Sequence, residues 1–494
     1  MSSQKQVIRN SIIYTISNIL LKAFSFLLLP LYTSYLTLED YGITGLIASF
    51  TSVAQYIITF SIFSSVVKFY TEYKDNLDKV RRLFGTIFAF VFISGLVFFV
   101  LFFILRRFML GYFFRGLSYY PTIFIAPSGL VFNSLYLVYI SILQALQHAK
   151  KTGIISIVFF FLNLFLNLIF VVWLRLGANG VLLSSSISYL VFAIYATLNL
   201  HRSGLIELCI DKSLLLQALR YSIPLLPHNL STTIAQLVSK VLINKNYSLS
   251  SVGIFNVASQ FGSIADMLQS SVHSAFTPWM YIRLKESRSG KDEQIVSLTN
   301  LLMAMYGFLF LCLSFFSQEA LFLLTNRSYY DAWMLIPLIV ISYTIKIIYY
   351  FYIDVMFYYL DLSNKIFWAT LSSAFLNILL SFVFIPKWDI YGSVLADILA
   401  MILRTTIIVL LARRRLKFGY RIGNFIIFEI ITISFIGAGL IPSYLKFGYT
   451  VSISNIIYKI SILVIYSIII ALYFKINIRL LIEGLKNKKW RIKY

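Results

Sequence analysis

Charged residues are scarce in this chain of 494 residues: Asp, Glu, Lys and Arg make up 12% of the sequence, whereas hydrophobic residues make up 59%. Soluble globular domains carry roughly a quarter charged residues, so this composition excludes that class and is typical of a polytopic membrane protein. The longest polar connections, around residues 201–222 and 279–294, are too short to enclose a core. No separate soluble domain is therefore expected.

Cysteine is almost absent as well, because Cys209 and Cys312 are the only two. Each stands alone in an apolar or amphipathic run, so we predict neither a structural disulfide nor a metal site. The sequence also has no Walker A run, no HExxH and no GxSxG. We therefore expect a transporter without catalytic residues or cofactors. Its energy would come from a gradient, with H+ or Na+ as candidate coupling ions, or from a separate protein.

Acidic residues are much rarer than basic ones: 19 Asp and Glu stand against 42 Lys and Arg, a net charge of +23. In a membrane protein the positive-inside rule explains such an excess, and no nucleic-acid partner is expected. Most of the basic residues fall in alternate connections and in the tail, which places both termini in the cytoplasm. The tail, residues 475–493, suits a topology anchor better than a site for anionic lipids or a partner.

The hydrophobic runs predict an all-α protein with fourteen membrane spans, since about 20 mostly apolar residues cross the hydrocarbon core. The predicted spans are 11–36, 43–67, 83–105, 121–143, 152–174, 180–200, 222–243, 252–275, 295–316, 333–357, 365–385, 390–412, 424–445 and 452–474.

An internal repeat relates the two halves of the chain. YLTLEDYGITGL, which starts at Tyr35, matches NYSLSSVGIFNV, which starts at Asn246, at a constant offset of 211. A second match aligns Lys151, Asn163 and Gly180 with Lys365, Asn377 and Gly392 at offsets of 212 to 214. Six spans separate equivalent positions, so both halves enter the membrane in the same direction and the pseudo-twofold axis follows the membrane normal. We predict six-helix lobes at 1–212 and 213–416, with two extra helices and a basic tail at 417–494.

Charges inside the spans mark candidate site residues, because an ionisable group in a bilayer is costly and usually functional. Lys22 lies near the middle of the first span, where Pro30 favours a bend, and we favour a cavity role for it. Lys346 and Arg404 are also deep. Lys240 is nearer a span end, where snorkelling is equally plausible. The remaining charges inside the spans are Asp266, Asp354, Asp397, Glu429 and Lys459, of which Asp354 and Glu429 are expected to be solvated at cytoplasmic ends.

Two helical patterns involve these charges. Asp266, Gln269, Ser270 and His273 recur at i, i+3, i+4 and i+7 and form a polar stripe; we favour a helix–helix hydrogen-bond seam somewhat over proton exchange at Asp266 and His273. Asp397 and Arg404 are two turns apart on one face, where a shared polar seam and pairing with other helices are equally plausible. At the deepest positions cations outnumber anions, which favours a phosphate-bearing cargo over a cationic drug.

The stretch NSIIYTISNILLKAFSFLLLPLYTSYLTLEDYGITGL (residues 10–46) resembles the start of bacterial polysaccharide-biosynthesis flippases. These are O-antigen and capsule repeat-unit translocases of the multidrug/oligosaccharidyl-lipid/polysaccharide exporter superfamily. Residues 221–262 resemble the opening of the same family's second half. The resemblance implies a multi-pass protein of the bacterial cytoplasmic membrane that moves an undecaprenyl-diphosphate oligosaccharide by alternating access. Membrane lipids, a polysaccharide polymerase and chain-length machinery are the implied partners.

The same resemblance implies roles for particular segments. Lys22 occupies a place similar to essential cations of related peptidoglycan-precursor flippases, and the last two spans correspond to a groove for the lipid tail. Together with Lys346, Arg404 and Lys240, Lys22 forms the expected substrate-binding set, and Asp266, His273 and Asp397 are the candidate ion-coupling residues. Family members often have an acidic–basic pair where this chain has Ser239 and Lys240. A multidrug/cation antiporter and a membrane-embedded glycopolymer polymerase or ligase remain alternatives, although the short outer connections, around 106–120 and 317–332, disfavour the enzyme.

Overall fold

The computed structural model describes residues 26, 28–207, 209–286, 293–413 and 420–475. Within these residues the regular elements are all helices and no strand is present, which confirms the predicted all-α class. The chain divides into two compact units. Unit 1 comprises the chain up to Gln260 with segments 324–329 and 370–400, and unit 2 comprises segments 261–323 and 330–369 and the chain from Met401 onward.

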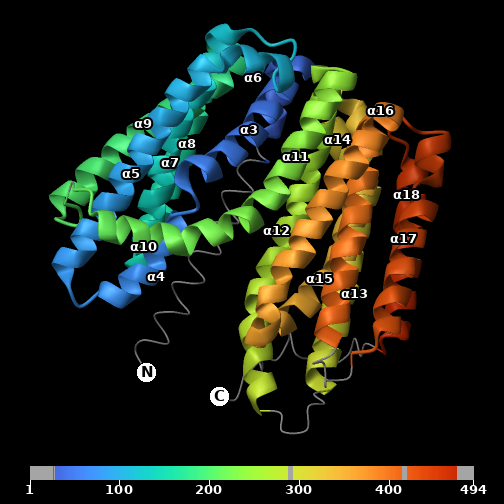
Figure 1. The fold of residues 1–494 in the computed structure, drawn as a ribbon. Coiled ribbons are helices and arrows are strands. Elements are labelled where there is room, and N and C mark those ends of the chain that lie inside the picture. Colours follow the sequence, from blue (N-terminus) through green and yellow to red (C-terminus); the bar gives the residue numbers. More distant parts are fainter. Residues whose placement is uncertain (1–25, 27, 208, 287–292, 414–419, 476–494) are drawn as a thin grey trace. The chain divides into compact units, whose positions relative to one another are not determined.

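Unit 1 contains the helices of the first half of the chain (Figure 1). They are α2 (Leu29–Tyr35), α3 (Leu38–Thr59), α4 (Phe63–Tyr73), α5 (Leu77–Ile104), α6 (Arg106–Tyr112), η1 (Tyr119–Ile123), α7 (Phe124–Ala145), α8 (Ala149–Asn167), η2 (Leu168–Trp173), α9 (Ala178–Arg202), α10 (Lys212–Ser222), η3 (Ile223–Leu225) and α11 (Leu226–Asn246). The start of α12 (Leu249–Glu286) and the middle of α16 (Leu360–Arg413) also belong to it.

Unit 2 contains the rest of α12 and the two ends of α16. Its other helices are α13 (Glu293–Phe315), α14 (Ser317–Leu324), most of η4 (Arg327–Met334), α15 (Ile336–Tyr358), α17 (Ile422–Leu445) and α18 (Ile453–Tyr473). The run of α16 is broken at Trp388 and Asp389, where the backbone leaves the helical region. Its two halves match the predicted spans 365–385 and 390–412.

Ten helices of the described chain are long and apolar enough to cross a membrane, which makes this a multi-pass membrane protein. They account for all the predicted spans except three. The first predicted span lies mostly outside the described residues. The seventh and eighth are present as α11 and α12 but are not among the ten.

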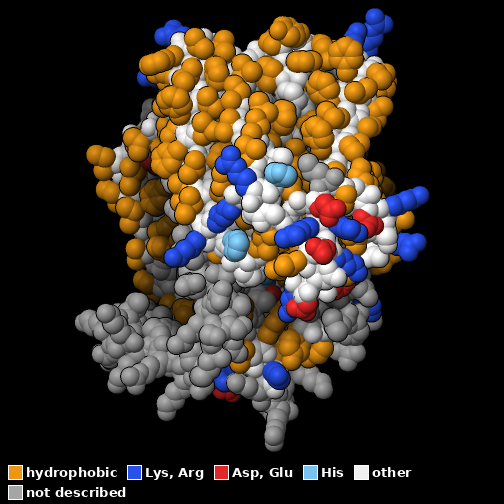
Figure 2. Space-filling model, turned by 90° about the vertical axis from the view of Figure 1, so that its left-hand side faces the viewer, with side chains coloured by type: hydrophobic (Ala, Val, Ile, Leu, Met, Phe, Trp, Pro, Cys, Tyr) orange, Lys and Arg blue, Asp and Glu red, His pale blue; other side chains and the backbone are white. Residues whose placement is uncertain are grey.

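Helix α7 is the centre of unit 1, because it packs against α3, α4, α5, α8 and α9. Its buried residues include Leu130, Val138, Tyr139 and Ile142. The outer faces of its neighbours carry exposed apolar side chains instead, among them Val100 on α5. Figure 2 shows the result on one face of the molecule, a broad hydrophobic surface beside a zone where charged and histidine side chains gather. A surface of this kind faces lipid in a membrane protein.

The second predicted span, 43–67, is broken. Helix α3 ends at Thr59, and the chain then passes through Phe60 and Ser61, both with positive φ (47° and 54°), before α4 begins. Two consecutive non-glycine residues rarely adopt this conformation. The buried Ser61 side chain accepts a hydrogen bond from Asn229 Nδ2 (3.2 Å), so α11 braces the break.

Residues that the predicted internal repeat makes equivalent meet where α3 and α12 cross. A Cβ atom added to Gly42 would overlap the carbonyl oxygen of Leu249, and one added to Gly253 would overlap the carbonyl oxygen of Leu38. Gly42 and Gly253 are equivalent in the repeat, as are Leu38 and Leu249. The contact is therefore reciprocal, as in a two-fold-symmetric interface. Both helices need glycine here because their backbones touch.

The starts of α3 and α12 are also capped in equivalent ways. The Asp40 amide donates to Thr37 Oγ1 (3.1 Å) at the start of α3, and the Ser251 amide donates to Ser248 Oγ (3.1 Å) at the start of α12. These pairs satisfy backbone donors that the first turn leaves free. The TLED and SLSS stretches therefore form equivalent helix starts.

Candidate functional site

The polar stripe predicted on residues 266–273 of α12 faces α15. Asp266 and Gln269 each contact α15: Lys346 Nζ donates to Asp266 Oδ1 (2.6 Å), and Gln269 Nε2 donates to the carbonyl oxygen of Tyr343 (2.6 Å). Ser270 instead bonds within its own helix, to the carbonyl oxygen of Met267. The stripe is therefore a helix–helix seam, as the spacing favours.

The Asp266–Lys346 ion pair keeps contact with the surroundings. The Lys346 side chain is 19% exposed and that of Asp266 is 29% exposed. The ammonium group also lies 5.3 Å from the ring centroids of Tyr343 and Tyr350, within the range of a cation–π contact. A partly exposed cation held by aromatic rings and one carboxylate can still be reached by a second anion.

A second acid–base pair lies two turns further along the same helices. His273 Nδ1 lies 3.3 Å from Asp354 Oδ2, and Thr277 Oγ1 donates to Asp354 Oδ1 (2.9 Å). The expectation that Asp354 is solvated is wrong, because its side chain is fully buried. Sequence spacing could not reveal this, since the partners that cover Asp354 come from α12. Glu429, expected to be solvated as well, is also buried.

Arg404 extends the set of charges in unit 2. Its guanidinium carbon lies 5.9 Å from the ring centroid of Tyr349 on α15. We call Asp266, His273, Lys346, Asp354 and Arg404 the charged seam. Two cations stand beside two carboxylates in this seam, so the net positive charge expected from the deepest sequence positions is not found within it. Lys22, the other predicted cation, lies outside the described residues.

Lys240 lies in unit 1, at the crossing of α3 and α12. Its Nζ donates to the carbonyl oxygen of Gly45 (3.0 Å) and to Asn256 Oδ1 (3.0 Å), and the residue is 8% exposed. Gly45 and Asn256 are themselves equivalent in the repeat. The buried ammonium group thus ties the two equivalent helices together, and it does not snorkel from the end of α11.

Asp397, the third candidate for ion coupling, is paired inside unit 1. Its Oδ1 accepts a hydrogen bond from Asn377 Nδ2 (2.5 Å) across the two halves of α16. Ser381 donates to Asn377 Oδ1 (3.5 Å) and lies 3.3 Å from Ser239. Oxygen atoms of four side chains therefore gather where the first half of α16 meets both α11 and the second half of α16. Within the described residues no cluster of three or more His, Cys, Asp or Glu could hold a metal ion.

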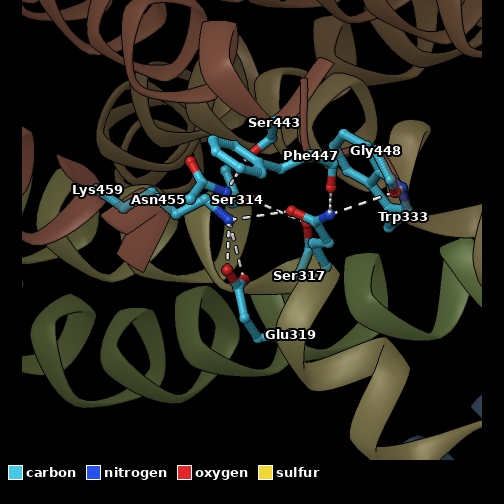
Figure 3. Close-up of polar contacts among 10 residues, drawn as sticks. Ser314, Ser317, Glu319, Trp333, Ser443, Phe447, Gly448, Asn455 and Lys459 are labelled. Carbon is cyan, nitrogen blue, oxygen red and sulfur yellow. Dashed lines mark hydrogen bonds and ion pairs between the residues drawn. The ribbon is translucent and has the colours of Figure 1, made fainter. Parts of the chain in front are cut away.

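Lys459 belongs to a further buried cluster in unit 2 (Figure 3). Its Nζ donates to both carboxylate oxygens of Glu319 (2.7 and 3.0 Å) and to Gln318 Oε1 (3.3 Å). Gln318 Nε2 in turn donates to the carbonyl oxygens of Phe447 and Gly448. This network joins α14 to α18 and to the loop between α17 and α18. The sequence pattern placed Glu319 in an outer connection and so missed the pair.

Comparison with known proteins assigns the chain to a family. A family model described as polysaccharide biosynthesis protein matches residues 7–284, more than half of the chain. The chain belongs to this family. No curated protein sequence matches it.

Solved structures share the fold of this polysaccharide biosynthesis protein. A lipid II flippase, MurJ, in an inward closed conformation aligns with a TM-score of 0.66 at 15% identity, covering 94% of this chain and 99% of MurJ. An inward-facing multidrug resistance MATE family transporter of the MOP superfamily aligns with a TM-score of 0.63 at 14% identity, covering 80% of this chain and 94% of that chain. A MOP superfamily transporter from Pyrococcus furiosus aligns at 0.57 and 15% identity, covering 83% and 95%. The predicted superfamily fold is thereby confirmed.

Proposed function

We propose that this protein is a flippase that moves undecaprenyl-diphosphate-linked oligosaccharide repeat units across the cytoplasmic membrane by alternating access. The family match supports a role in polysaccharide biosynthesis, and the shared fold with a lipid II flippase supports transport of a lipid-linked cargo. The observation that carries the proposal is the charged seam. Its cations lie on helices of spanning length, where charge is retained only at a cost.

The cargo and the seam suit each other chemically. A diphosphate and its sugars cannot cross hydrocarbon unaided, whereas the polyprenyl tail can remain in the lipid. Lys346 is partly exposed and its ammonium group has further donors beyond the one bonded to Asp266. We infer that Lys346 and Arg404 bind the diphosphate, with Lys22 as a third cation. The acid partner of Lys346 weakens this binding and so favours release.

Transport in proteoliposomes tests the proposal. Wild type should translocate labelled undecaprenyl-diphosphate oligosaccharide, and Lys346→Ala should lose at least about 90% of the rate, since a charge-assisted contact contributes about 1.5–3 kcal/mol. Lys22→Ala should behave in the same way. Lys68→Ala is the matched control, because it removes an exposed cation that lies beside Glu72 on α4. Normal transport by both Lys346→Ala and Lys22→Ala would disprove the cationic site.

A double variant separates binding from folding. Lys346→Ala leaves the partly exposed Asp266 without this cation, and the loss of an ion-pair partner on a spanning helix is destabilising in its own right. Lys346→Ala/Asp266→Ala removes both charges. If the cation binds cargo, the double variant stays inactive although it is well folded. If the loss in the single variant reflects the unpaired acid alone, the double variant recovers transport.

A second candidate function, cation antiport, is favoured by the two carboxylates of the seam. Asp266 and Asp354, with His273 beside Asp354, could exchange a proton or Na+ for a cationic drug. The same groups, together with Asp397, are our candidates for ion coupling in a flippase. Export of a cationic dye from cells distinguishes the two functions, because the flippase should give none.

A further inference from the structure

Unit 1 carries a second surface that differs from the charged seam. Helix α11 is of spanning length but is not among the apolar spans. On one of its faces His228, Thr232 and Gln236 recur at i, i+4 and i+8, and all three side chains are exposed. The row is polar through most of the helix, which is unusual for a helix that crosses a bilayer.

Helix α3 has a matching row. Ser52 is exposed, and its neighbours on the same face, Thr51 and Gln55, are half-buried. The two helices run antiparallel, because Gly45 contacts Lys240 near one end and Ser61 contacts Asn229 near the other. Interpolation between these contacts places Ser52 and Gln55 within about one residue of the levels of Gln236 and Thr232.

The two rows form one surface. At about 100° per residue, Ser52 and Gln55 stand about 20° and 80° around α3 from Gly45. Gln236 and Thr232 stand about 40° and 80° around α11 from Lys240, all in the same rotation sense. Because α3 and α11 run antiparallel, two rows that are displaced in the same sense around their own helix axes lie on the same side of the helix pair. We call Thr51, Ser52, Gln55, Thr232 and Gln236 the neutral polar face.

Two properties limit what can cover this face. None of its side chains carries a formal charge, so it offers no counter-ion to a diphosphate. The side chains of Gln55, Thr232 and Gln236 have no hydrogen-bond partner in the parts of the chain that the structure describes. Lipid cannot satisfy amide and hydroxyl groups, which therefore need a polar ligand or water. An amide offers donors and an acceptor side by side, which matches neighbouring hydroxyls of a sugar ring.

We propose that the neutral polar face binds the sugar hydroxyls of the cargo. This inference rests on the proposed flippase function and adds to it a surface that distinguishes one sugar from another. Water alone on the face is the competing occupant.

Binding of two probes to the purified protein tests the inference. The first probe is undecaprenyl diphosphate without sugar, and the second is the tightest binder from a panel that carries one to five neutral hexose or N-acetylhexosamine units. Gln55→Leu/Gln236→Leu should weaken binding of the sugar-bearing probe by about tenfold, since the hydrogen bonds of two amide groups are lost. Binding of the sugar-free probe should not change. Gln55→Asn/Gln236→Asn should recover part of the affinity.

The control is Gln217→Leu, the same substitution at an exposed position of α10 in the same unit. It should bind both probes as wild type does. An equal loss for both probes in the double variant, or no loss for either, would overturn the inference. It would also fail if no member of the panel bound more tightly than the sugar-free probe, which is the result expected for a face covered by water. The flippase proposal fails separately, if wild type moves no lipid-linked sugar.

Discussion

At the scale of single residues, the two halves of the chain place an acidic side chain at equivalent turns, but from different positions. Gly177 and Asp389 occupy equivalent turns with nearly the same backbone, φ 56° and ψ −136° against φ 50° and ψ −136°. In the first half Asp40 reaches this turn and accepts from the amide of Ala178 (3.0 Å). In the second half the acid is in the turn itself, and Ser251, the equivalent of Asp40, donates to Asp389 Oδ2 (3.4 Å).

Because glycine and the acidic residue have exchanged places between the two turns, we predict opposite effects on stability for substitutions at Asp389 and Gly177. Asp389→Gly removes a side chain from a conformation that favours glycine, which gains about 1 kcal/mol and offsets the long bond to Ser251. We expect its stability to equal or slightly exceed that of wild type. Gly177→Ala should lose about 1–2 kcal/mol, because its Cβ would also lie 2.7 Å from Asp40 Oδ1. Thermal melting of the purified variants measures both effects.

The double variant Asp389→Gly/Ser251→Asp provides the control, because it copies the arrangement of the first half into the second. It should be at least as stable as Asp389→Gly alone. If Asp389→Gly were destabilised as strongly as Gly177→Ala, the two turns would not be equivalent in energy.

At the scale of helices, the sequence predicts what is local. Helices α13, α15, α17 and α18 begin and end within three residues of the predicted spans, because apolar runs and polar ends lie in the chain itself. The break at Phe60 and Ser61 was not predictable. Neither residue is a usual helix breaker, and the brace comes from Asn229, far along the chain. Repeat spacing did identify Gly42 and Gly253, which make reciprocal contacts, as equivalent positions.

In the candidate site, too, the sequence predicted local features but not contacts between distant segments. The polar stripe on α12 was predicted from its spacing, as were the charges of the seam other than Asp354. The partners of these charged side chains were not predicted, because they depend on which helices meet. Asp354 lies beside His273, and Lys240 joins α11 to the crossing of α3 and α12. Sequence therefore identified which side chains carry charge but not which of those charges are already neutralised.

The buried cluster around Lys459 anchors the helices α17 and α18, which have no counterpart in the repeat. Its side chain is fully buried and that of Glu319 is 16% exposed, so neither charge is well solvated alone. We expect Lys459→Ala or Glu319→Ala to lose about 3 kcal/mol of stability, because each leaves an uncompensated charge. Lys459→Met/Glu319→Leu should return close to wild type, since an apolar pair replaces the ion pair. Fluorescence-detected gel filtration after heating would measure this, and a double variant as unstable as the single ones would contradict it.

At the scale of the whole molecule, the reciprocal crossing of α3 and α12 is a place where equivalent residues of the two repeats touch. Gly42 and Gly253 bring the backbones into contact, and Lys240 holds Gly45 and Asn256 beside them. In alternating access the two repeats rock against one another around a central site. We predict that this contact, which is made by equivalent residues of both repeats, separates in one of the two states.

A reversible cross-link tests whether it does. A Cβ atom at Gly45 would lie 2.6 Å from Asn256 Cγ, so cysteines at these positions fall within the reach of a disulfide. In a background with Cys209 and Cys312 replaced, Gly45→Cys/Asn256→Cys should transport when reduced and lose nearly all transport when oxidised, with recovery on reduction. Each single cysteine variant should be insensitive to oxidant. If the fully oxidised protein still transported at the reduced rate, the crossing would stay closed throughout the cycle, and the movement that exposes the cargo would have to occur elsewhere in the molecule.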